Sequence, residues 1–540
     1  MVEIPLATPA APAVPFAAGQ SRRSFLHRLA AIGGTGLVMA GLDAFGMSMA
    51  SAQTAPPALA GSGAGKRVVI LGAGVGGMTA AYELAKLGYQ CQVIEARSFA
   101  GGRCQTARAG FSLTELGGDA QTCEFDDGQY INHGPWRIPY NHQSTLHYTK
   151  EFGVPLEVMV NDNDASYVFF EGGSGPLASR PVRKAQVAAD MRGQTAELLA
   201  KAVRKGTLDD PMGAEDKELF VAYLVREGYL SPKDLGYSGA EGRGYDVWPG
   251  ALTDPGPRKP STPFAMADIL HSRAWRTLRS VAGFSQQRTM FQPVGGMDRI
   301  AQGFAHAVGH MIQYSTVVER IGQDDGGVEV AWVDGAGQRG TTRADYCVCT
   351  IPLSVLQHIE AAVPVAVKQA MAAVAYQPVG KIGLQMKRRF WEEDHFIYGG
   401  HVYTDNEEIG SISLPSWDWQ GAKGTVLGYY QFDAAAIRIS AMTPAERAEF
   451  ATAFGQKVFP QYRDNVEKSF SVAWHRVRHS MGGWAEWSDE ARRTAYPVLC
   501  EPAGRIYLAG EHLSYLTGWQ AGAIESAWLQ VAKLHKQASA

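Results

Sequence analysis

One arginine stands in a loop where a charged side chain is costly to bury. Arg137 lies within residues 131–142 (INHGPWRIPYNH), between Trp136 and Ile138 and close to two prolines. Proline lacks an amide N–H, so the segment is expected to be a shaped loop and not a helix or a central strand. The guanidinium can serve as a structural ion-pair partner or as a clamp that grips a carboxylate through two parallel hydrogen bonds. The stretch alone favours the structural role, because buried charges in proteins are usually paired.

A glycine-rich turn could hold a phosphate. Gly72, Gly74 and Gly77 satisfy the pattern G-x-G-x-x-G, after an apolar strand expected over 67–71 and before a helix expected over 78–87. Gly72 permits a tight turn, Gly74 lets the backbone approach a pyrophosphate, and Gly77 lets helix and strand pack closely. The N-terminus of the helix then faces the phosphate charge. This strand–turn–helix context favours a dinucleotide site over a glycine turn without a ligand.

Residues beyond the turn extend the same site. Glu95 ends the next expected strand and can bond both hydroxyls of an adenosine ribose, which disfavours the 2′-phosphate of NADP. Gly102 and Arg103 belong to a loop that could touch the pyrophosphate from a second side. Near the C-terminus, Gly510 and Glu511 follow the apolar strand RIYLA, and this carboxylate could bind a ribityl chain. The turn alone leaves NAD and FAD open, but a cofactor held by both ends of the chain is typical of a flavin.

Length and composition limit the class of protein. The chain has 540 residues, of which 46% are hydrophobic, and this length predicts two or three domains. A formal net charge of −3 gives no basic field, so no nucleic-acid partner is expected. The six cysteines form neither a disulfide framework nor a zinc pattern, and no metal site is expected. The sequence has no G-x-S-x-G, which argues against a serine hydrolase.

The N-terminus has the features of an export signal. Arg22 and Arg23 form a twin-arginine pair, a weakly apolar run follows, and Ala50–Ala52 supplies an A-x-A cleavage site. A single membrane anchor is the alternative, but polar and glycine residues interrupt the run. We therefore expect residues 1–52 to be removed as a twin-arginine signal peptide, which predicts a periplasmic or secreted protein. Residues 53–65 are rich in Ala, Pro, Gly and Ser and are expected to form a flexible linker.

Motifs spread over most of the remaining chain resemble the flavin amine oxidase family, and most of all its bacterial L-amino-acid oxidases. They are VVILGAGVGGMTAAYELAKLGYQCQVIEARSFAGGR, the GGM that ends at Met297, KIGLQMKRRFWEE and RIYLAGEHLSYLTGWQAGAIES. The resemblance implies an α/β fold. In this fold a Rossmann-type FAD-binding domain is interleaved with a mixed-sheet substrate domain and a helical insertion.

Residue patterns place these domains along the chain. The segment AQVAADMRGQTAELLAKAVRKG has helical periodicity, and GVEVAWV, ADYCVCTIPL, KIGLQMKRRFW and KGTVLGYYQF read as strands. The domain boundaries expected from the resemblance are 66–120, 286–350 and 495–540 for the FAD-binding domain, 121–180 and 351–494 for the substrate-binding domain, and 181–285 for the helical domain.

The same resemblance assigns roles to individual side chains. GPWRIPYNH is similar to the L-amino-acid oxidase segment whose arginine clamps the substrate carboxylate, so Arg137 becomes the expected clamp. Tyr429 is expected to bond the same carboxylate, with Tyr430 as the alternative one residue away. Lys381 is expected to hold a water beside the flavin, and burial would lower its pKa. The alternative for Lys381 is a surface lysine on an edge strand.

Further residues are implied in the cofactor and substrate sites. Gly518 and Trp519 match a pair near the flavin and the substrate amine. Trp519 is therefore expected to be a catalytic residue. The residues expected to bind FAD are Gly72, Gly74, Gly76, Gly77, Glu95, Ala96, Arg97, Gly102, Arg103, Gly134, Pro135, Trp136, Arg137, Val318, Gly510, Glu511, Gly518, Trp519 and Ala523. Monoamine oxidases bind their flavin through a cysteine that SYLTGWQ lacks, and Cys500 lies too far upstream, so noncovalent FAD is expected.

Other aromatic residues and histidines have less definite roles. The candidates for the substrate side-chain pocket are Trp484, Trp487, Trp417, Trp419, Tyr245 and Trp248. The histidines His133, His142 and His147 show no metal-ligand spacing and are expected in loops and at the surface.

The expected reaction is oxidative deamination of L-amino acids to 2-oxo acids, with ammonia and hydrogen peroxide as the other products. Dioxygen is the expected oxidant, and a homodimer is the expected assembly. One alternative is an oxidative decarboxylation like that of tryptophan 2-monooxygenases, which the clamp does not exclude. Others are a monoamine or polyamine oxidase, for which Arg137 would have no use, and a FAD-binding protein without turnover. An NAD-dependent dehydrogenase would leave the C-terminal GEH segment unexplained.

Overall fold

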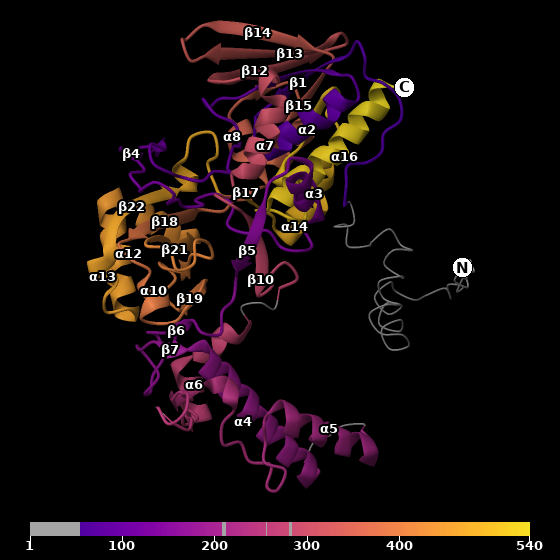
Figure 1. Ribbon diagram of the computed structural model, residues 1–540. Coiled ribbons are helices and arrows are strands. Elements are labelled where there is room, and N and C mark those ends of the chain that lie inside the picture. The colour runs from indigo at the N-terminus through magenta and orange to yellow at the C-terminus, as the bar shows by residue number, and fades with distance from the viewer. Residues whose placement is uncertain (1–53, 208–211, 255, 280–282, 540) are drawn as a thin grey trace, which may run out of the picture. The chain divides into compact units, whose positions relative to one another are not determined.

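Five parallel strands form the sheet that carries the glycine turn (Figure 1). The structure is a computed structural model that describes residues 54–207, 212–254, 256–279 and 283–539, so the twin-arginine signal expected over 1–52 lies outside the described residues. In spatial order the strands are β11 (Ile312–Gln313), β2 (Gln90–Ile94), β1 (Arg67–Leu71), β15 (Tyr346–Cys349) and β24 (Ile506–Leu508). Their segments come from both ends and the middle of the described chain.

The alternation of side chains along β1 explains why both faces of this sheet are covered. Val68 and Ile70 point to one face, where they pack with α2 (Val75–Lys86), α7 (Arg299–Val308) and α16 (Gln520–Ala538). Val69 and Leu71 point to the other face and join a second apolar cluster. A parallel sheet buried on both faces requires such a continuous run of apolar residues.

The second cluster packs beneath a four-stranded sheet of long antiparallel strands. In spatial order its strands are β14 (Arg339–Ala344), β13 (Gly327–Asp334), β12 (Thr316–Asp324) and the short, parallel β16 (Glu360–Ala361). Cys347 and Cys349 on β15 belong to this cluster, and both are buried free thiols. They point to the same face because they are two residues apart on the strand.

A mixed seven-stranded sheet forms the second large layer. Its strands are, in spatial order, β22 (Val466–Ala473), β18 (Val379–Met386), β21 (Gly424–Phe432), β20 (Ser411–Leu414), β19 (Gly400–Thr404), β6 (Tyr167–Phe169) and β7 (Val182–Arg183). β18 pairs with β21 on one side and with β22 on the other, and this register sets Lys381 opposite Tyr430 and Val472. Lys381 is therefore on an inner strand and not on an edge.

The expected helical region contains two long helices and several short elements. The long helices are α4 (Lys184–Lys205) and α5 (Ala214–Glu227). The short elements include the helix α6 (Met266–Ser272) and the strands β8 (Tyr245–Val247) and β9 (Lys259–Pro260). Ala196 and Ala200 of α4 pack against Leu224 of α5 in a small apolar cluster. The helical periodicity of residues 185–206 is thus confirmed by α4.

The remaining elements connect these layers. The helices are α3 (Gln143–Glu151), α8 (Leu353–Leu356), α9 (Val365–Ala372), α10 (Phe390–Glu393), α11 (Asp433–Ser440), α12 (Pro444–Val458), α13 (Tyr462–Asn465), α14 (Asp489–Thr494) and α15 (Tyr496–Cys500). The strands are β3 (Ser112–Thr114), β4 (Ala120–Thr122), β5 (Leu156–Val160), β10 (Thr289–Pro293), β17 (Ala375–Tyr376) and β23 (Ala485–Glu486). Among the residues described here, no helix combines the length and the apolar character that crossing a bilayer requires.

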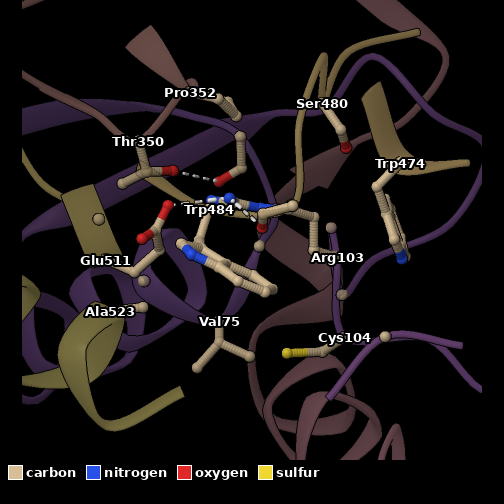
Figure 2. Close-up of a pocket in the computed structure, with 18 of the residues that line it drawn as sticks. Val75, Arg103, Cys104, Thr350, Pro352, Trp474, Ser480, Trp484, Glu511 and Ala523 are labelled. Carbon is tan, nitrogen blue, oxygen red and sulfur yellow. Dashed lines mark hydrogen bonds and ion pairs between the residues drawn. The ribbon is translucent and has the colours of Figure 1, made fainter. Parts of the chain in front are cut away.

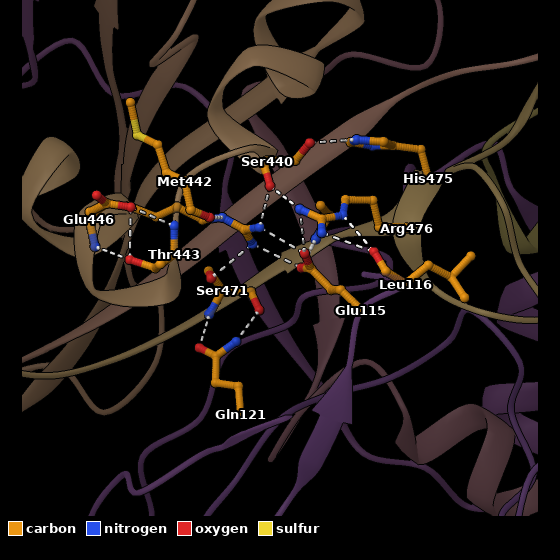
Figure 3. A network of polar contacts seen from close by, with 12 residues as sticks. Glu115, Leu116, Gln121, Ser440, Met442, Thr443, Glu446, Ser471, His475 and Arg476 are labelled. Atoms are coloured by element: carbon orange, nitrogen blue, oxygen red, sulfur yellow. Dashed lines mark hydrogen bonds and ion pairs between the residues drawn. The ribbon is translucent and has the colours of Figure 1, made fainter. Parts of the chain in front are cut away.

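A buried charge network ties the loop after β3 to the seven-stranded sheet (Figure 3). Glu115 accepts hydrogen bonds from Arg447 Nη1 at 2.9 Å and Nη2 at 2.7 Å, and also from the backbone N–H of Ala473 at 2.7 Å. Arg476 approaches the same carboxylate at 3.8 Å. A buried carboxylate bonded in this way costs little, whereas removing one partner would leave an uncompensated charge.

The segment expected to be a flexible linker is held in place at its end. The carbonyl of Ala60 lies 2.9 Å from His535 Nε2, and the N–H of Gly63 donates to the carbonyl of Leu87 at 2.7 Å. The composition of the segment did not indicate this docking, because both contacts use backbone groups that every residue carries.

Candidate active site

One cavity of about 560 Å³ brings together residues that are far apart in the sequence (Figure 2). It runs from the glycine turn and β12 past the loop with Arg137 to β18, β21 and the turn before α16. Every residue expected to bind the cofactor lines it except Gly77. Lys381 and both residues of the Gly518–Trp519 pair also line it.

The glycine turn has the backbone shape that its pattern predicted. Gly72 has φ +98°, and a Cβ there would lie 2.9 Å from Thr350 Oγ1. A Cβ at Gly77 would lie 1.9 Å from the Gly72 carbonyl oxygen, so Gly77 permits close packing without facing the cavity. At Gly74 the nearest heavy atom to such a Cβ is 4.0 Å away, which leaves the backbone open to a ligand.

Helix α2 begins at Val75, three residues before the expected start, because the turn glycines enter its first turn. Gly74 provides no side-chain cap, and the first turn has no acidic residue. The N–H groups of this turn and the positive end of the helix dipole therefore favour an anion.

Glu95 lies directly after β2, where its carboxylate can both fix the glycine turn and bind a ligand. Its Oε2 accepts the N–H of Ala73 at 2.7 Å, and its Oε1 accepts the N–H of Arg97 at 2.8 Å. The carboxylate thus fixes the glycine turn, while each oxygen keeps a lone pair for a further donor such as a ribose hydroxyl. Glu95 and Val318 of β12 both line the cavity.

The side-chain carboxylate of Glu511, near the end of the chain, is held by an ion pair. Arg103 Nη1 lies 2.8 Å from Glu511 Oε1 and also donates to the Gly483 carbonyl at 2.8 Å (Figure 2). Gly510 has φ +142°, and a Cβ there would lie 2.6 Å from the His512 ring. The two glycine loops meet as expected, since a Cβ at Gly102 would lie 3.1 Å from the Gly74 Cα.

These observations test whether a dinucleotide fits. One continuous cavity is lined by the uncapped N-terminus of α2, by Glu95 and by the open backbone at Gly74. They match the charge of a pyrophosphate and the hydroxyls of a ribose. The cavity continues past them to Trp136 and Lys381, which leaves room for the second half of the molecule.

Lys381 is enclosed at the far end of this cavity. It is 1% exposed, and its Nζ donates to the carbonyls of Asn132 and Gly134. The Nζ also lies 4.4 Å from the centre of the Tyr430 ring and 5.4 Å from that of Trp136. Burial, together with the nearby positive charge of Arg137, holds the pKa of Lys381 well below its usual range. The surface-lysine alternative is therefore wrong.

Arg137 faces the cavity with most of its hydrogen-bonding capacity unused. Its Nη2 donates to Gln286 Oε1 at 3.2 Å, and its Nε is buried with no partner among the described residues. It forms no ion pair with any residue that the structure describes. A carboxylate ligand would satisfy the free N–H groups of this guanidinium, because a charged acceptor can bond two N–H groups at once. The structural ion pair considered from the sequence is thus not seen within the described residues.

The tyrosine at the cavity is Tyr430 and not Tyr429. Tyr429 is 1% exposed, is hydrogen-bonded to Ser471 and packs in the core of the seven-stranded sheet on the side of Arg447. Tyr430 lines the cavity, and the charge of Arg137 acts on its hydroxyl. Successive residues of a strand point to opposite faces, so the expectation for Tyr429 was wrong by one residue.

Trp519 lies beside a histidine that was expected at the surface. The Trp519 and His142 rings meet edge to face with centroids 4.7 Å apart, and His142 lines the cavity. His133 is also buried, where it stacks on Trp474. The expectation that both histidines are at the surface was therefore wrong. Burial lowers the pKa of His142 to about 4, so a neutral ring faces the cavity.

Comparison with known proteins identifies the family. The family model described as flavin containing amine oxidoreductase matches residues 75–535. The chain belongs to this family. It is 24% identical over 483 residues to an L-amino-acid oxidase of Pseudechis australis, a match that covers 85% of each chain. It is 26% identical over 482 residues to an L-amino-acid oxidase of Echis ocellatus, covering 85% of this chain and 87% of that protein.

Solved structures of the same fold include two amine oxidases. Cyclohexylamine oxidase from Brevibacterium oxydans IH-35A is similar with a TM-score of 0.59 and 16% identity, covering 88% of this chain and 100% of that one. Wild-type putrescine oxidase bound to putrescine is similar with a TM-score of 0.56 and 18% identity, covering 87% and 98%. At this level of identity the structures establish the FAD amine oxidase fold.

FAD is the cofactor of this flavin-dependent amine oxidoreductase. Its noncovalent attachment stays a prediction. Cys500 ends α15 and does not line the cavity, but Cys104 does. Burial raises the pKa of the Cys104 thiol to about 11, so the thiolate that a covalent bond would need is disfavoured.

Aromatic side chains complete the wall of the cavity in this oxidoreductase. Trp484, one of the candidates for the side-chain pocket, lines the cavity and lies between Val75 and Glu511 in Figure 2. Trp474 and Phe432 also line it, and sequence reasoning missed them. The other candidates, Trp487, Trp417, Trp419, Tyr245 and Trp248, do not line it. Strand alternation around Tyr430 could have indicated Phe432, which is two residues further along β21.

Proposed function

We propose that the protein is an L-amino-acid oxidase, which converts an L-amino acid, dioxygen and water into a 2-oxo acid, ammonia and hydrogen peroxide. The observation that carries the proposal is the Arg137 guanidinium. It faces the cavity that contains Lys381 and has no ion-pair partner among the described residues. An oxidase for simple amines would bury this charge without use, at a cost in stability. The names of the curated relatives support the same activity.

The residues of the chain have separable tasks in this reaction. Arg137 and Tyr430 hold the α-carboxylate, which turns Cα–H toward the cofactor and contributes to the rate by positioning. Bound FAD supplies the two-electron oxidation of the substrate and the subsequent reduction of dioxygen.

Lys381 acts on protons and water. Because its pKa is lowered, it is neutral over a wider pH range than an exposed lysine and can accept a hydrogen bond from a water. Such a water is suited to take part in hydrolysis of the imino acid. Trp136 and Trp484 line the same cavity, and their apolar rings would limit the entry of other water.

Paired substrates test the proposal. We would measure peroxide, ammonia and carbon dioxide from L-phenylalanine against phenethylamine and from L-lysine against cadaverine, with each D-enantiomer as a control. The expected result is peroxide and ammonia from L-amino acids alone. Carbon dioxide in place of ammonia would identify oxidative decarboxylation. Equal or better rates with the amines would refute the carboxylate clamp.

A variant isolates the residue that the proposal depends on. Arg137→Met removes two charge-assisted hydrogen bonds, each worth about 1.5–3 kcal/mol, so kcat/KM for L-amino acids should fall roughly 10²- to 10⁴-fold. The flavin absorbance spectrum should be retained, since the adenosine end of the cavity is untouched. Loss of the flavin together with activity would show that the arginine serves the cofactor instead.

Export by the twin-arginine route is a further proposal, supported by Arg22, Arg23 and the A-x-A at Ala50–Ala52. Mass spectrometry of the protein from a bacterial periplasm should then give a mature N-terminus at Gln53. Replacement of both arginines by lysine should leave the precursor in the cytoplasm. The homodimer remains a prediction that light scattering of the mature protein can test.

A further inference from the structure

The Arg137 side chain needs an orienting partner. A guanidinium on a long side chain has many rotamers, and a carboxylate clamp functions only when it is held close to one geometry. The bond to Gln286 Oε1, at 3.2 Å, is the one hydrogen bond that the guanidinium makes to a described residue. The orientation of the Gln286 amide therefore decides whether Arg137 meets an acceptor or a donor.

The backbone around Arg137 and Gln286 is held by strand pairing. Ile138 and Phe291 of β10 exchange two backbone hydrogen bonds, of 2.7 Å and 2.9 Å. The N–H of Asn161, directly after β5, donates to the carbonyl of Arg288 at 2.8 Å. β5 and β10 are themselves an antiparallel pair. The three segments thus present their side chains at one end of a fixed ribbon.

A chain of buried side chains continues from Gln286 into the seven-stranded sheet. Asn161 Nδ2 lies 3.4 Å from Gln286 Oε1 and 2.8 Å from the carbonyl oxygen of Gln287. Asn161 Oδ1 lies 3.3 Å from His401 Nε2, and His401 Nδ1 is hydrogen-bonded to Ser413 Oγ. Asn161 and Ser413 are almost fully buried, and His401 is 6% exposed.

The direction of every bond in this chain follows from one group. The carbonyl of Gln287 can only accept, so the atom of Asn161 that faces it is the NH₂ group. The Asn161 oxygen must then face His401, whose Nε2 has to donate, and Nδ1 accepts from the Ser413 hydroxyl. A neutral ring meets both requirements, and burial, followed by the charge of Arg137, lowers the pKa of His401 to about 3.

We propose that Asn161 and His401 are positioning residues for the carboxylate clamp, and that they act through the amide of Gln286. This inference rests on the proposed function. When these hydrogen bonds are intact, the NH₂ group of Asn161 keeps the Gln286 oxygen turned toward Arg137. When one of them is lost, the Gln286 amide can turn over and set its own NH₂ group against the guanidinium, which displaces the clamp.

The test measures carboxylate binding directly in the FAD-loaded enzyme. Benzoate is the probe, and its Kd is read from the change in flavin absorbance. Asn161→Ala and His401→Leu should weaken benzoate binding roughly 3- to 10-fold, the range of one lost hydrogen bond. His401→Gln should restore the wild-type Kd, because its amide can donate to Asn161 from the position of Nε2. For L-phenylalanine, kcat/KM should fall by a similar factor, and His401→Gln should restore it.

A matched control separates positioning from packing. His395 is a half-buried histidine that also has both ring nitrogens bonded, to Tyr167 and Gln461, and it does not line the cavity. His395→Leu should leave benzoate binding unchanged. If Asn161→Ala does not fold, Asn161→Ser gives the same comparison with a smaller packing defect.

The outcomes distinguish two failures. If Arg137→Met loses benzoate binding while the Asn161 and His401 variants bind like the wild type, the positioning chain is refuted and the clamp stands. If Arg137→Met binds benzoate as the wild type does, the clamp itself fails, and the positioning inference fails with it. A Kd for His401→Gln as poor as that for His401→Leu would also refute the chain.

Discussion

The two neighbouring tyrosines of β21 provide the sharpest test of how the sheet presents its residues. Tyr430 lines the cavity, and its hydroxyl makes no hydrogen bond to the part of the chain that the structure describes. Tyr429 points the other way and is bonded to Ser471 in the core. Removing the Tyr430 hydroxyl should therefore lower catalysis and leave stability unchanged. Removing the Tyr429 hydroxyl should lower stability and leave catalysis unchanged.

The magnitudes follow from the partners of each hydroxyl. A hydrogen bond from Tyr430 to a substrate carboxylate is worth about 1.5–3 kcal/mol, so Tyr430→Phe should lower kcat/KM for L-amino acids roughly 10- to 150-fold. Its stability should hardly change, because no hydrogen bond to a described residue is lost. Tyr429→Phe loses one neutral bond, so its free energy of unfolding should fall by about 0.5–1.5 kcal/mol while kcat/KM is retained.

Both variants can be assayed in the same way. Peroxide release against L-phenylalanine concentration gives kcat/KM, and urea unfolding followed by tryptophan fluorescence gives the change in stability. The flavin spectrum of each variant controls for cofactor loading. If Tyr429→Phe loses kcat/KM and Tyr430→Phe does not, the assignment of faces on β21 is wrong.

Three further predictions concern other parts of the molecule. Glu115→Ala leaves the Arg447 charge buried without its partner and should lower the free energy of unfolding by about 3–5 kcal/mol, measured by urea unfolding; an unchanged midpoint would contradict the network. Gly77→Ala places a Cβ 1.9 Å from the Gly72 carbonyl oxygen and should lower the flavin-to-protein ratio, measured by absorbance. Lys381 has a folded pKa below its ordinary value of 10.5, so between these two values the unfolded state binds more protons and stability rises with pH. Lys381→Met removes this dependence, so its Tm relative to the wild type should be highest at neutral pH and should decline as pH rises toward about 10.5; a constant difference would refute the lowered pKa.

The parts of the site that depend on the backbone were predictable from local sequence patterns. The glycine turn at Gly72 and Gly74 and the acidic end of β2 at Glu95 are local patterns, because each needs only a short segment in one conformation. The strands of the central sheet were readable for the same reason, since a run of apolar residues is what a strand buried on both faces requires. The role of Arg137 came from the family resemblance, as the loop alone favoured the opposite interpretation.

Which side chains face one another depends on contacts between segments that are far apart in the sequence. The sequence left Tyr429 and Tyr430 adjacent, and the orientation of β21 placed the second at the cavity. It gave no signal for Gln286, Asn161 and His401, which lie on three different segments and meet through strand pairing. Contacts of this kind depend on register between distant strands, and a shift of one residue would turn each side chain to the opposite face.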